Sequence, residues 1–249
     1  MNKMIMTTIT VVLCVTLLRG NDAERLEELE RICAFVPSDD LFTPEVIPTP
    51  DDIIAKYYVT TNQIAMDLKV IAAKYTAAET NEYKRGARAT AISCLSRYGG
   101  TNDLAFLATI MTNRGDYAQD NAVGASIGIL KHSPELVDFA HGIVTNTATY
   151  NYFLRCWTCI LLKDMCEEKY SSYVEDLAQR TRIAAFFVDQ VGLPSDLAIT
   201  MDKCACELNP WYRHSQQRRD NLARLRPPGL TGRPAEIYDA AQRDAAQED

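Results

Sequence analysis

The sequence predicts an all-α fold, a right-handed array of antiparallel helix pairs. Three observations support it: apolar residues recur at three- and four-residue steps, no segment alternates apolar and polar residues, and one helical pattern occurs three times. The three copies begin at Tyr83, Tyr117 and Tyr150, a period of 33–34 residues. A helical repeat of this length is typical of stacked helix arrays, which bind partners more often than they catalyse reactions.

Residues 1–20 have the composition of a secretory signal peptide. Lys3 precedes an apolar run from Ile5 to Leu18, and Arg19 and an acidic segment follow it. The run is shorter than the roughly 20 apolar residues of a membrane-spanning helix. We therefore expect an extracytoplasmic protein, periplasmic or secreted, with no stable membrane span once the segment is removed. The alternative is a protein anchored by an uncleaved N-terminal segment.

Residues 21–48 are expected to form a short helix and a connector. Leu26, Leu29, Ile32 and Cys33 have helical spacing within Asp22–Ala34, and prolines dominate the connector that follows.

The helical repeat domain is expected to span residues 49–225. Thr49 is a helix cap, Pro50 fits the first helical position, and an apolar stripe from Ile54 to Tyr75 predicts one long helix. Further stripes, separated by glycine and proline stops, predict these helices: Thr80–Tyr98, a short helix after Thr101, Tyr117–Leu130, Pro134–Val144, Tyr150–Leu162, Ser171–Gln190, a shorter helix from Ser195 after the stop at Gly192–Pro194, and Pro210–Leu225. Proline and glycine interrupt the pattern after Arg226, so residues 226–249 are predicted to be a flexible tail.

Small and aliphatic residues occupy matching positions in the three copies. The matched sets are Ala89, Val123 and Cys156; Ala91, Ala125 and Thr158; and Leu95, Ile129 and Leu162. In these positions the chain resembles the HEAT-like helical repeat proteins, in a short-period form, over about residues 49–190. It departs from them in lacking the proline and the Asp/Arg pattern of full-length units, and in a period below their usual ~40 residues. The resemblance implies an α-solenoid or superhelix.

The charge balance argues against a nucleic-acid partner. The formal net charge is −7, whereas contact with phosphates needs a basic field. We expect a non-enzymatic scaffold that binds a protein or peptide partner, because a stacked array exposes a continuous face of its second helices. The candidate partner-binding residues are the expected solvent-side residues of those helices: Asp103, Asp138, His141, Glu175 and Arg182.

Two motifs support an alternative function as an extracytoplasmic enzyme. Gly124–Gly128 matches the nucleophile elbow of serine hydrolases, with Ser126 as the nucleophile, but that motif requires a preceding strand. Cys156 and Cys159 form a CxxC motif, which in thiol redox proteins lies at a helix start and here begins inside a helix. We expect neither to be catalytic and no cofactor to be needed. A third possible function is that of a structural component of the cell envelope.

Seven cysteines follow the signal segment, an odd number that cannot all pair within one chain. An oxidising compartment favours disulfides, and the candidates are Cys166, Cys204 and Cys206, which lie in breaks between helices. Structural zinc is the alternative, with ligands drawn from Cys156, Cys159, Cys166, Cys204, Cys206 and His214. We expect disulfides and no metal.

Overall fold

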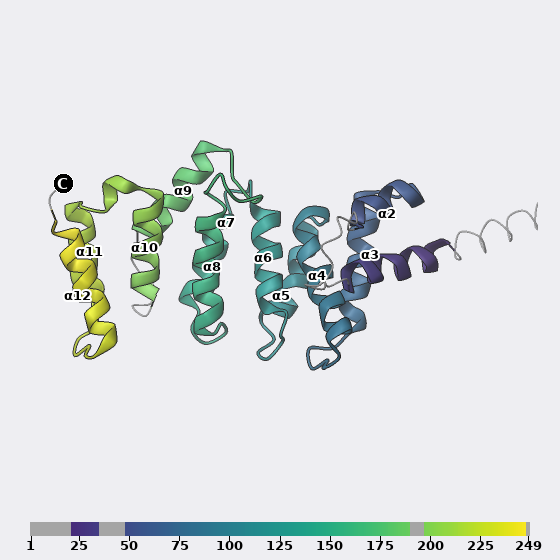
Figure 1. Cartoon of the computed structure of the whole chain (residues 1–249), viewed down its shortest axis with the longest axis horizontal. Helices are drawn as coiled ribbons and strands as arrows, with labels where there is room; N and C mark the ends of the chain where they lie inside the picture. Colours follow the sequence, from purple (N-terminus) through teal and green to yellow (C-terminus); the bar gives the residue numbers. More distant parts are fainter. Residues whose placement is uncertain (1–20, 35–47, 190–196, 248–249) are drawn as a thin grey trace, which may run out of the picture. The chain divides into compact units, whose positions relative to one another are not determined.

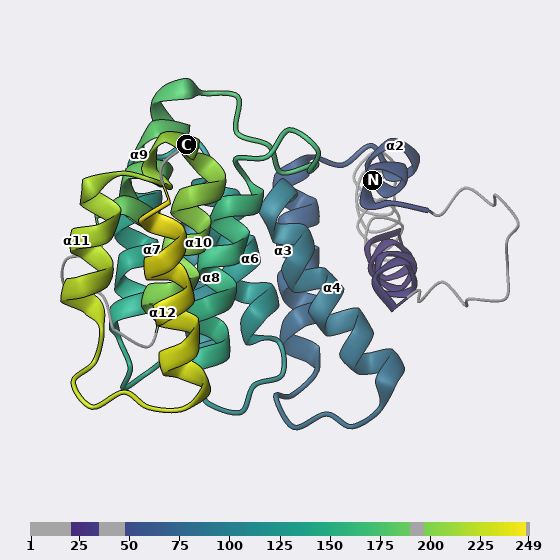
Figure 2. The same ribbon diagram turned by 60° about the vertical axis from the view of Figure 1, so that its left-hand side comes forward.

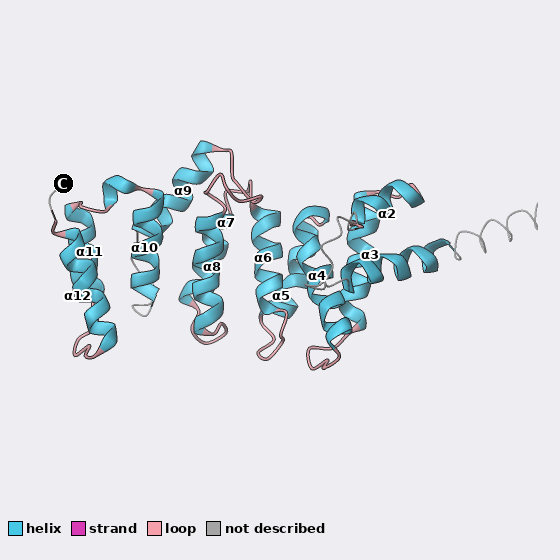
Figure 3. Ribbon diagram, viewed as in Figure 1, coloured by secondary structure: helices cyan, strands magenta, loops and turns pink. Residues whose placement is uncertain are grey.

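The computed structural model describes residues 21–34, 48–189 and 197–247, and within these ranges the chain is helical and contains no strand (Figures 1 and 3). After a helix over residues 21–34, the elements are α2 (Pro50–Tyr57), α3 (Thr61–Lys74), α4 (Glu82–Tyr98), η1 (Thr101–Asp103), α5 (Leu104–Met111), α6 (Gln119–Leu130), α7 (Leu136–Thr145), α8 (Tyr152–Asp164), α9 (Leu177–Val188), α10 (Ala198–Leu208), η3 (Pro210–Tyr212), α11 (Gln216–Leu225) and α12 (Arg233–Ala245). The all-α prediction is therefore confirmed for the described residues.

The chain divides into two compact units. The first comprises the described residues up to Leu107 together with Gly115–Ala125. The second comprises Ala108–Arg114 and the described residues from Ser126 onward.

In the first unit, the helix over residues 21–34 is amphipathic, as predicted. It buries Leu29 and Cys33 in the core. Its polar side forms ion pairs with α3: the Nε of Arg25 lies 2.7 Å from a carboxylate oxygen of Asp67, and Lys74 lies 2.6 Å from Glu30. The N-terminal helix is thus held by both apolar burial and charge.

The single long helix predicted between Thr49 and Tyr75 is wrong, because Tyr58 ends α2. The backbone of Tyr58 is left-handed, with φ 53° and ψ 38°. Thr60 then caps α3 by accepting the N–H of Gln63 at 3.2 Å. The apolar spacing continues across this break, so it did not reveal where one helix ends and the next begins.

A buried arginine joins the two helices of the α3–α4 hairpin. The Nε of Arg88, on α4, donates to the backbone carbonyl of Ala72 near the end of α3, at 3.1 Å. The second unit repeats this arrangement in its α7–α8 hairpin, where the Nε of Arg155 donates to the carbonyl of Val144 at 2.9 Å. Both arginines lie five residues after the tyrosine that opens their copy of the repeat, and Ala122 holds the same position in the middle copy.

The second unit continues from α8 through four further helices. α9 packs on α10, and α11 lies beside α12 (Figure 2). Phe187 and Met201 are fully buried there.

The flexible tail predicted for residues 226–249 contains helix α12. Gly232, with φ 68°, turns the chain, and Pro234 fits the first turn. Tyr238 is buried and its hydroxyl donates to the carbonyl of Leu225 at 3.2 Å. The prediction failed because α12 has few large apolar residues, and one aromatic anchor with one polar contact is a weak signal in sequence.

Helix α9 begins later than predicted. Val174 is buried and its N–H donates to the carbonyl of Met165 at 2.7 Å, which holds residues 171–176 outside the helix. The side chain of Asp176 caps α9 by accepting the N–H of Ala178 at 2.9 Å. Helix α7 also begins later than predicted, at Leu136 rather than at Pro134.

Several predictions fall on residues outside the described ranges. These are the signal peptide over residues 1–20, most of the connector before Pro48, and the helix stop at Gly192–Pro194. Among the helices in the described ranges, none combines the length and apolar character needed to cross a bilayer.

Candidate binding groove

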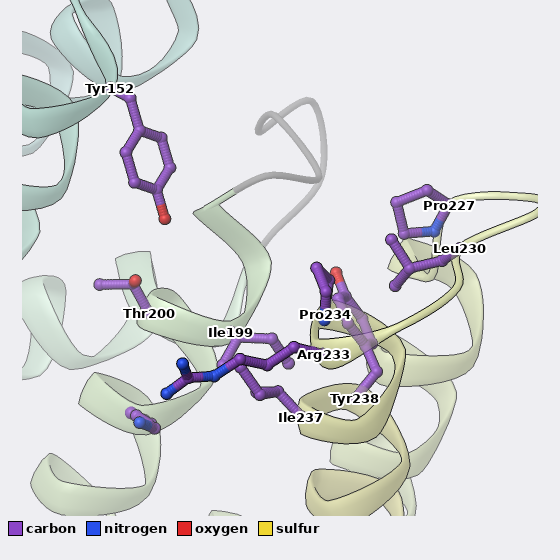
Figure 4. Close-up of a pocket in the computed structure, with 10 residues that line it drawn as sticks. Tyr152, Ile199, Thr200, Pro227, Leu230, Arg233, Pro234, Ile237 and Tyr238 are labelled. Atoms are coloured by element: carbon purple, nitrogen blue, oxygen red, sulfur yellow. The ribbon is translucent and has the colours of Figure 1, made fainter.

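The second unit carries a surface groove of about 610 Å³ between α10 and α12, bordered by the N-terminal end of α8 (Figure 4). One wall is α10, and the opposite wall is α12 with the turn that precedes it. The groove is mainly apolar, and its apolar lining comes from Ile199, Pro227, Leu230, Pro234, Ile237 and Tyr238. An apolar ligand that displaces water from this lining would gain binding free energy from the burial of apolar surface.

Two cations lie in this apolar lining. Lys203 comes from α10 and Arg233 from α12, and Arg233 extends its guanidinium from α12 toward α10 (Figure 4). Neither forms an ion pair or hydrogen bond with any residue in the described part of the chain. The acidic neighbour of Lys203 on α10, Glu207, is instead 2.9 Å from Lys163. The groove therefore has a positive charge that the described residues leave uncompensated.

Hydroxyl groups complete the lining. Tyr152 of α8 points its ring toward Thr200 of α10 (Figure 4). A ligand with a carboxylate can therefore meet both cationic and hydroxyl groups beside apolar side chains.

An aromatic stripe leads away from the groove along α8. Its aromatic members are Tyr152, Phe153 and Trp157, and the aliphatic Ile160 follows them. Phe153 is 64% exposed. The rings of Phe153 and Trp157 are parallel, with centroids 6.4 Å apart. Tyr152 belongs to both features, so the stripe begins at the border of the groove.

A buried charge network fixes α11 and α12 on α10. The guanidinium of Arg218 contacts both carboxylate oxygens of Asp202 at 2.8–3.1 Å and donates to Asp244 of α12 at 2.6 Å. It also donates to the carbonyl of Arg213 at 2.8 Å. This network lines a second hollow of about 670 Å³, which shares Lys203 with the groove. Arg218 therefore determines how the two groove walls are spaced.

The network predicts a pH dependence of stability. The hydrogen bond from Arg218 holds the pKa of Asp244 below its ordinary value of 3.8, although burial opposes the shift. A carboxyl group whose pKa is lower in the folded chain stabilises the fold above its unfolded pKa, and this contribution is lost as the pH falls through the folded pKa. Asp244→Asn should therefore reduce the fall of the urea midpoint between about pH 5 and about pH 3.

Far-UV circular dichroism during urea titration at the two pH values measures this effect. The matched control is Asp239→Asn, which removes a more exposed carboxylate from the same helix. Equal slopes for Asp244→Asn and wild type would contradict the role given to the Arg218–Asp244 bond.

The structure does not place the five predicted partner-binding residues in the groove. Asp103 was expected on the solvent side but is buried. Its carboxylate bonds Lys69 and accepts the N–H of Gly100 at 2.9 Å, and these bonds outweigh burial and lower the pKa of Asp103. It is a capping residue, because the N-terminal turn of η1 needs an acceptor there.

The other four predicted residues are exposed but lie elsewhere. Asp138 and His141 are on α7, Arg182 is on α9, and Glu175 precedes the cap of α9. They remain candidates for a different surface. The sequence did not reveal the groove for two reasons. One wall, α12, lies in the segment predicted to be a flexible tail, and for α10 only the position of its first residues was predicted.

The two motifs that suggested enzymes lie inside helices. Ser126 is fully buried within α6, next to Met111. Cys159 is fully buried in α8, and burial raises its pKa. Neither side chain has the exposed strand-to-helix turn or the helix-start position that its chemistry requires.

All seven cysteines of the described ranges are free thiols, so the disulfides predicted from Cys166, Cys204 and Cys206 are not formed in the structure. These three lie in different surroundings: Cys166 near Arg180, Cys204 near Lys163 and Cys206 near Arg218. No group of three or more histidine, cysteine or acidic side chains within the described ranges is arranged to hold a metal ion.

Comparison of the chain with protein-family models, with curated proteins and with solved structures finds no match.

Proposed function

We propose that this chain is a non-enzymatic helical scaffold that holds an extended peptide segment of a partner protein in the groove between α10 and α12. The observation that carries the proposal is the pair of uncompensated cations, Lys203 and Arg233, in an apolar lining. Both side chains are exposed at the groove surface, and a charge on a binding surface favours an opposite charge on its ligand. The peptide should therefore combine acidic residues with aromatic or aliphatic ones.

The aromatic stripe of α8 favours a peptide over a compact small molecule. Tyr152 lines the groove, and Phe153, the next residue of α8, is exposed outside the lining, where a longer ligand can reach it. Aromatic side chains that are exposed and ordered are typical anchors for peptide partners.

The repeated arginine arrangement supports the proposal of a HEAT-like array. Arg88 and Arg155 occupy the same repeat position and make the same bond to the preceding helix. Chains built from such hairpins stack them side by side, and a right-handed α-solenoid is the arrangement we propose. We further propose an extracytoplasmic location, from the signal-like composition of residues 1–20, and no nucleic-acid partner, from the net charge of −7.

Selection of a phage-displayed random dodecapeptide library on the purified full chain tests the peptide-binding function. We expect enriched peptides to carry an acidic residue within a few positions of aromatic or aliphatic residues. The double variant Lys203→Glu/Arg233→Glu should bind a selected peptide roughly 10- to 100-fold more weakly, because it removes two exposed charge pairs worth up to about 1 kcal/mol each and adds repulsion of similar size. Fluorescence anisotropy of the labelled peptide measures this loss.

The matched control is Asp138→Lys/Arg182→Glu, which reverses two exposed charges of the predicted α7 and α9 surface. It should leave the affinity unchanged, and both double variants should keep the far-UV circular dichroism of wild type. Loss of binding in the control alone would move the site to α7 and α9. Enrichment of peptides without acidic residues would contradict the charge argument.

A further inference from the structure

The N-terminal helix and α4 bring two cysteines together in the first unit. Cys33 lies near the end of the helix over residues 21–34, and Cys94 lies in α4. Their thiols are neighbours, close enough for each to shift the pKa of the other. Cys33 is only 1% exposed, whereas Cys94 is half-buried, so small reagents can reach Cys94 first.

The contact makes the two thiols chemically different. The hydrogen bond from Cys33 and the positive charge of Arg97 lower the pKa of Cys94, against the effect of burial. The same bond, together with burial, raises the pKa of Cys33. A partly exposed thiol with a lowered pKa beside a second thiol is the arrangement in which disulfide exchange is fastest.

We propose that Cys33 and Cys94 are a disulfide-forming pair that ties the N-terminal helix to α4, a modification site separate from the binding groove. The oxidant is a small-molecule disulfide such as oxidised glutathione. The Cys94 thiolate attacks one sulfur of that disulfide, its S–S bond breaks, and one glutathione leaves as a thiol after taking up a proton. The Cys33 sulfur then gives up its proton, attacks Cys94 and expels the second glutathione thiol. Two protein thiols are oxidised, and one glutathione disulfide is reduced to two thiols.

The other cysteines with resolved shifts lack this reactivity. Burial raises the pKa of Cys166 to about 11, of Cys204 to about 12 and of Cys206 to about 11. Cys159 is enclosed beside the sulfur of Met201, 3.1 Å away. The first bond formed on oxidation should therefore be Cys33–Cys94.

Treatment of the reduced full chain with oxidised glutathione, followed by intact mass and peptide mapping, tests the proposal. Wild type should lose the mass of two hydrogen atoms and yield one crosslinked peptide containing Cys33 and Cys94. The bond closes a long loop, so the equilibrium constant for unfolding of the first unit should fall about a hundredfold. A reducing agent should reverse both changes.

Single serine variants separate the two steps. Cys33→Ser should stop at a mixed disulfide, with one glutathione on Cys94, and Cys94→Ser should not react at these positions. Cys166→Ser is the matched control, a buried cysteine of the second unit, and should behave as wild type. A crosslink between other cysteines in folded wild type, or equal reaction rates for Cys94→Ser and wild type, would overturn the proposal. If a serine variant loses its helical signal, wild type is instead labelled with iodoacetamide after unfolding in urea, with and without prior oxidation. Oxidation must then protect both Cys33 and Cys94 from the label.

Discussion

Replacement of Asp116 by alanine is expected to destabilise the first unit by about 3–5 kcal/mol, because it leaves the buried guanidinium of Arg88 without its carboxylate. The two side chains form a bidentate pair with distances of 2.6 and 2.7 Å, and their exposed fractions are 6% and 2%. Asp116 also accepts the N–H of Ala118 at 3.0 Å. Urea unfolding followed by far-UV circular dichroism measures the loss.

Two further variants make this test specific. Asp239→Ala breaks a more exposed pair with Arg226 and should cost less than about 1 kcal/mol. Arg88→Met/Asp116→Leu removes both charges and should recover much of the stability lost in Asp116→Ala, since no buried charge remains unpaired. A loss below about 1 kcal/mol for Asp116→Ala would contradict this expectation, because it would show that water solvates the guanidinium of Arg88.

Replacement of Arg218 by methionine should have an effect of similar size in the second unit. Asp202 is 1% exposed and would lose its partner, so we expect a loss of about 3–5 kcal/mol. The variant also removes the bond between Arg218 and Asp244 that fixes α12. Peptide affinity should therefore fall together with stability, because α12 forms one wall of the groove.

Arg224→Met is the matched control for Arg218. It removes an exposed arginine from the same helix, and the side chain of Arg224 donates to Asn221 at 3.1 Å. It should change the free energy of unfolding by about 0.5 kcal/mol or less. If Arg218→Met kept the wild-type stability and lost only peptide affinity, Arg218 would contact the peptide rather than support the groove.

The apolar pattern was sufficient to predict an all-helical chain but not the positions of several helix ends. α4 contains the first repeated segment, whereas α6 and α8 begin two residues after the tyrosines that open the second and third copies. The matched positions Ala91, Ala125 and Thr158 are all buried. The break at Tyr58 and the late start of α9 depend on a left-handed residue and on one buried backbone bond, which apolar spacing does not encode. The position of a helix end depends on such single contacts, whereas the presence of a helix depends on apolar spacing over many residues.

The groove and the buried ion pairs were harder to predict for a different reason. Arg88, Asp116, Asp202 and Arg218 are charged, and a sequence pattern places charged residues on the solvent side. Each is instead buried because an oppositely charged partner from another part of the chain, 28 residues away for Arg88 and 16 residues away for Arg218, neutralises it. The partner is known only once the chain is folded. The same holds for Lys203 and Arg233, which belong to one site only because α10 and α12 pack together.

The arginines that join the α3–α4 and α7–α8 hairpins predict which substitutions homologous chains would carry there. The Nε–H of arginine points sideways from the side chain toward the carbonyl of the preceding helix, and lysine has no donor at that place. The middle copy carries a small, fully buried residue, Ala122, at this position. Homologous chains should therefore alternate between arginine and small residues at positions 88, 122 and 155, and the exchange of arginine for lysine, ordinarily the most frequent between basic residues, should be rare there.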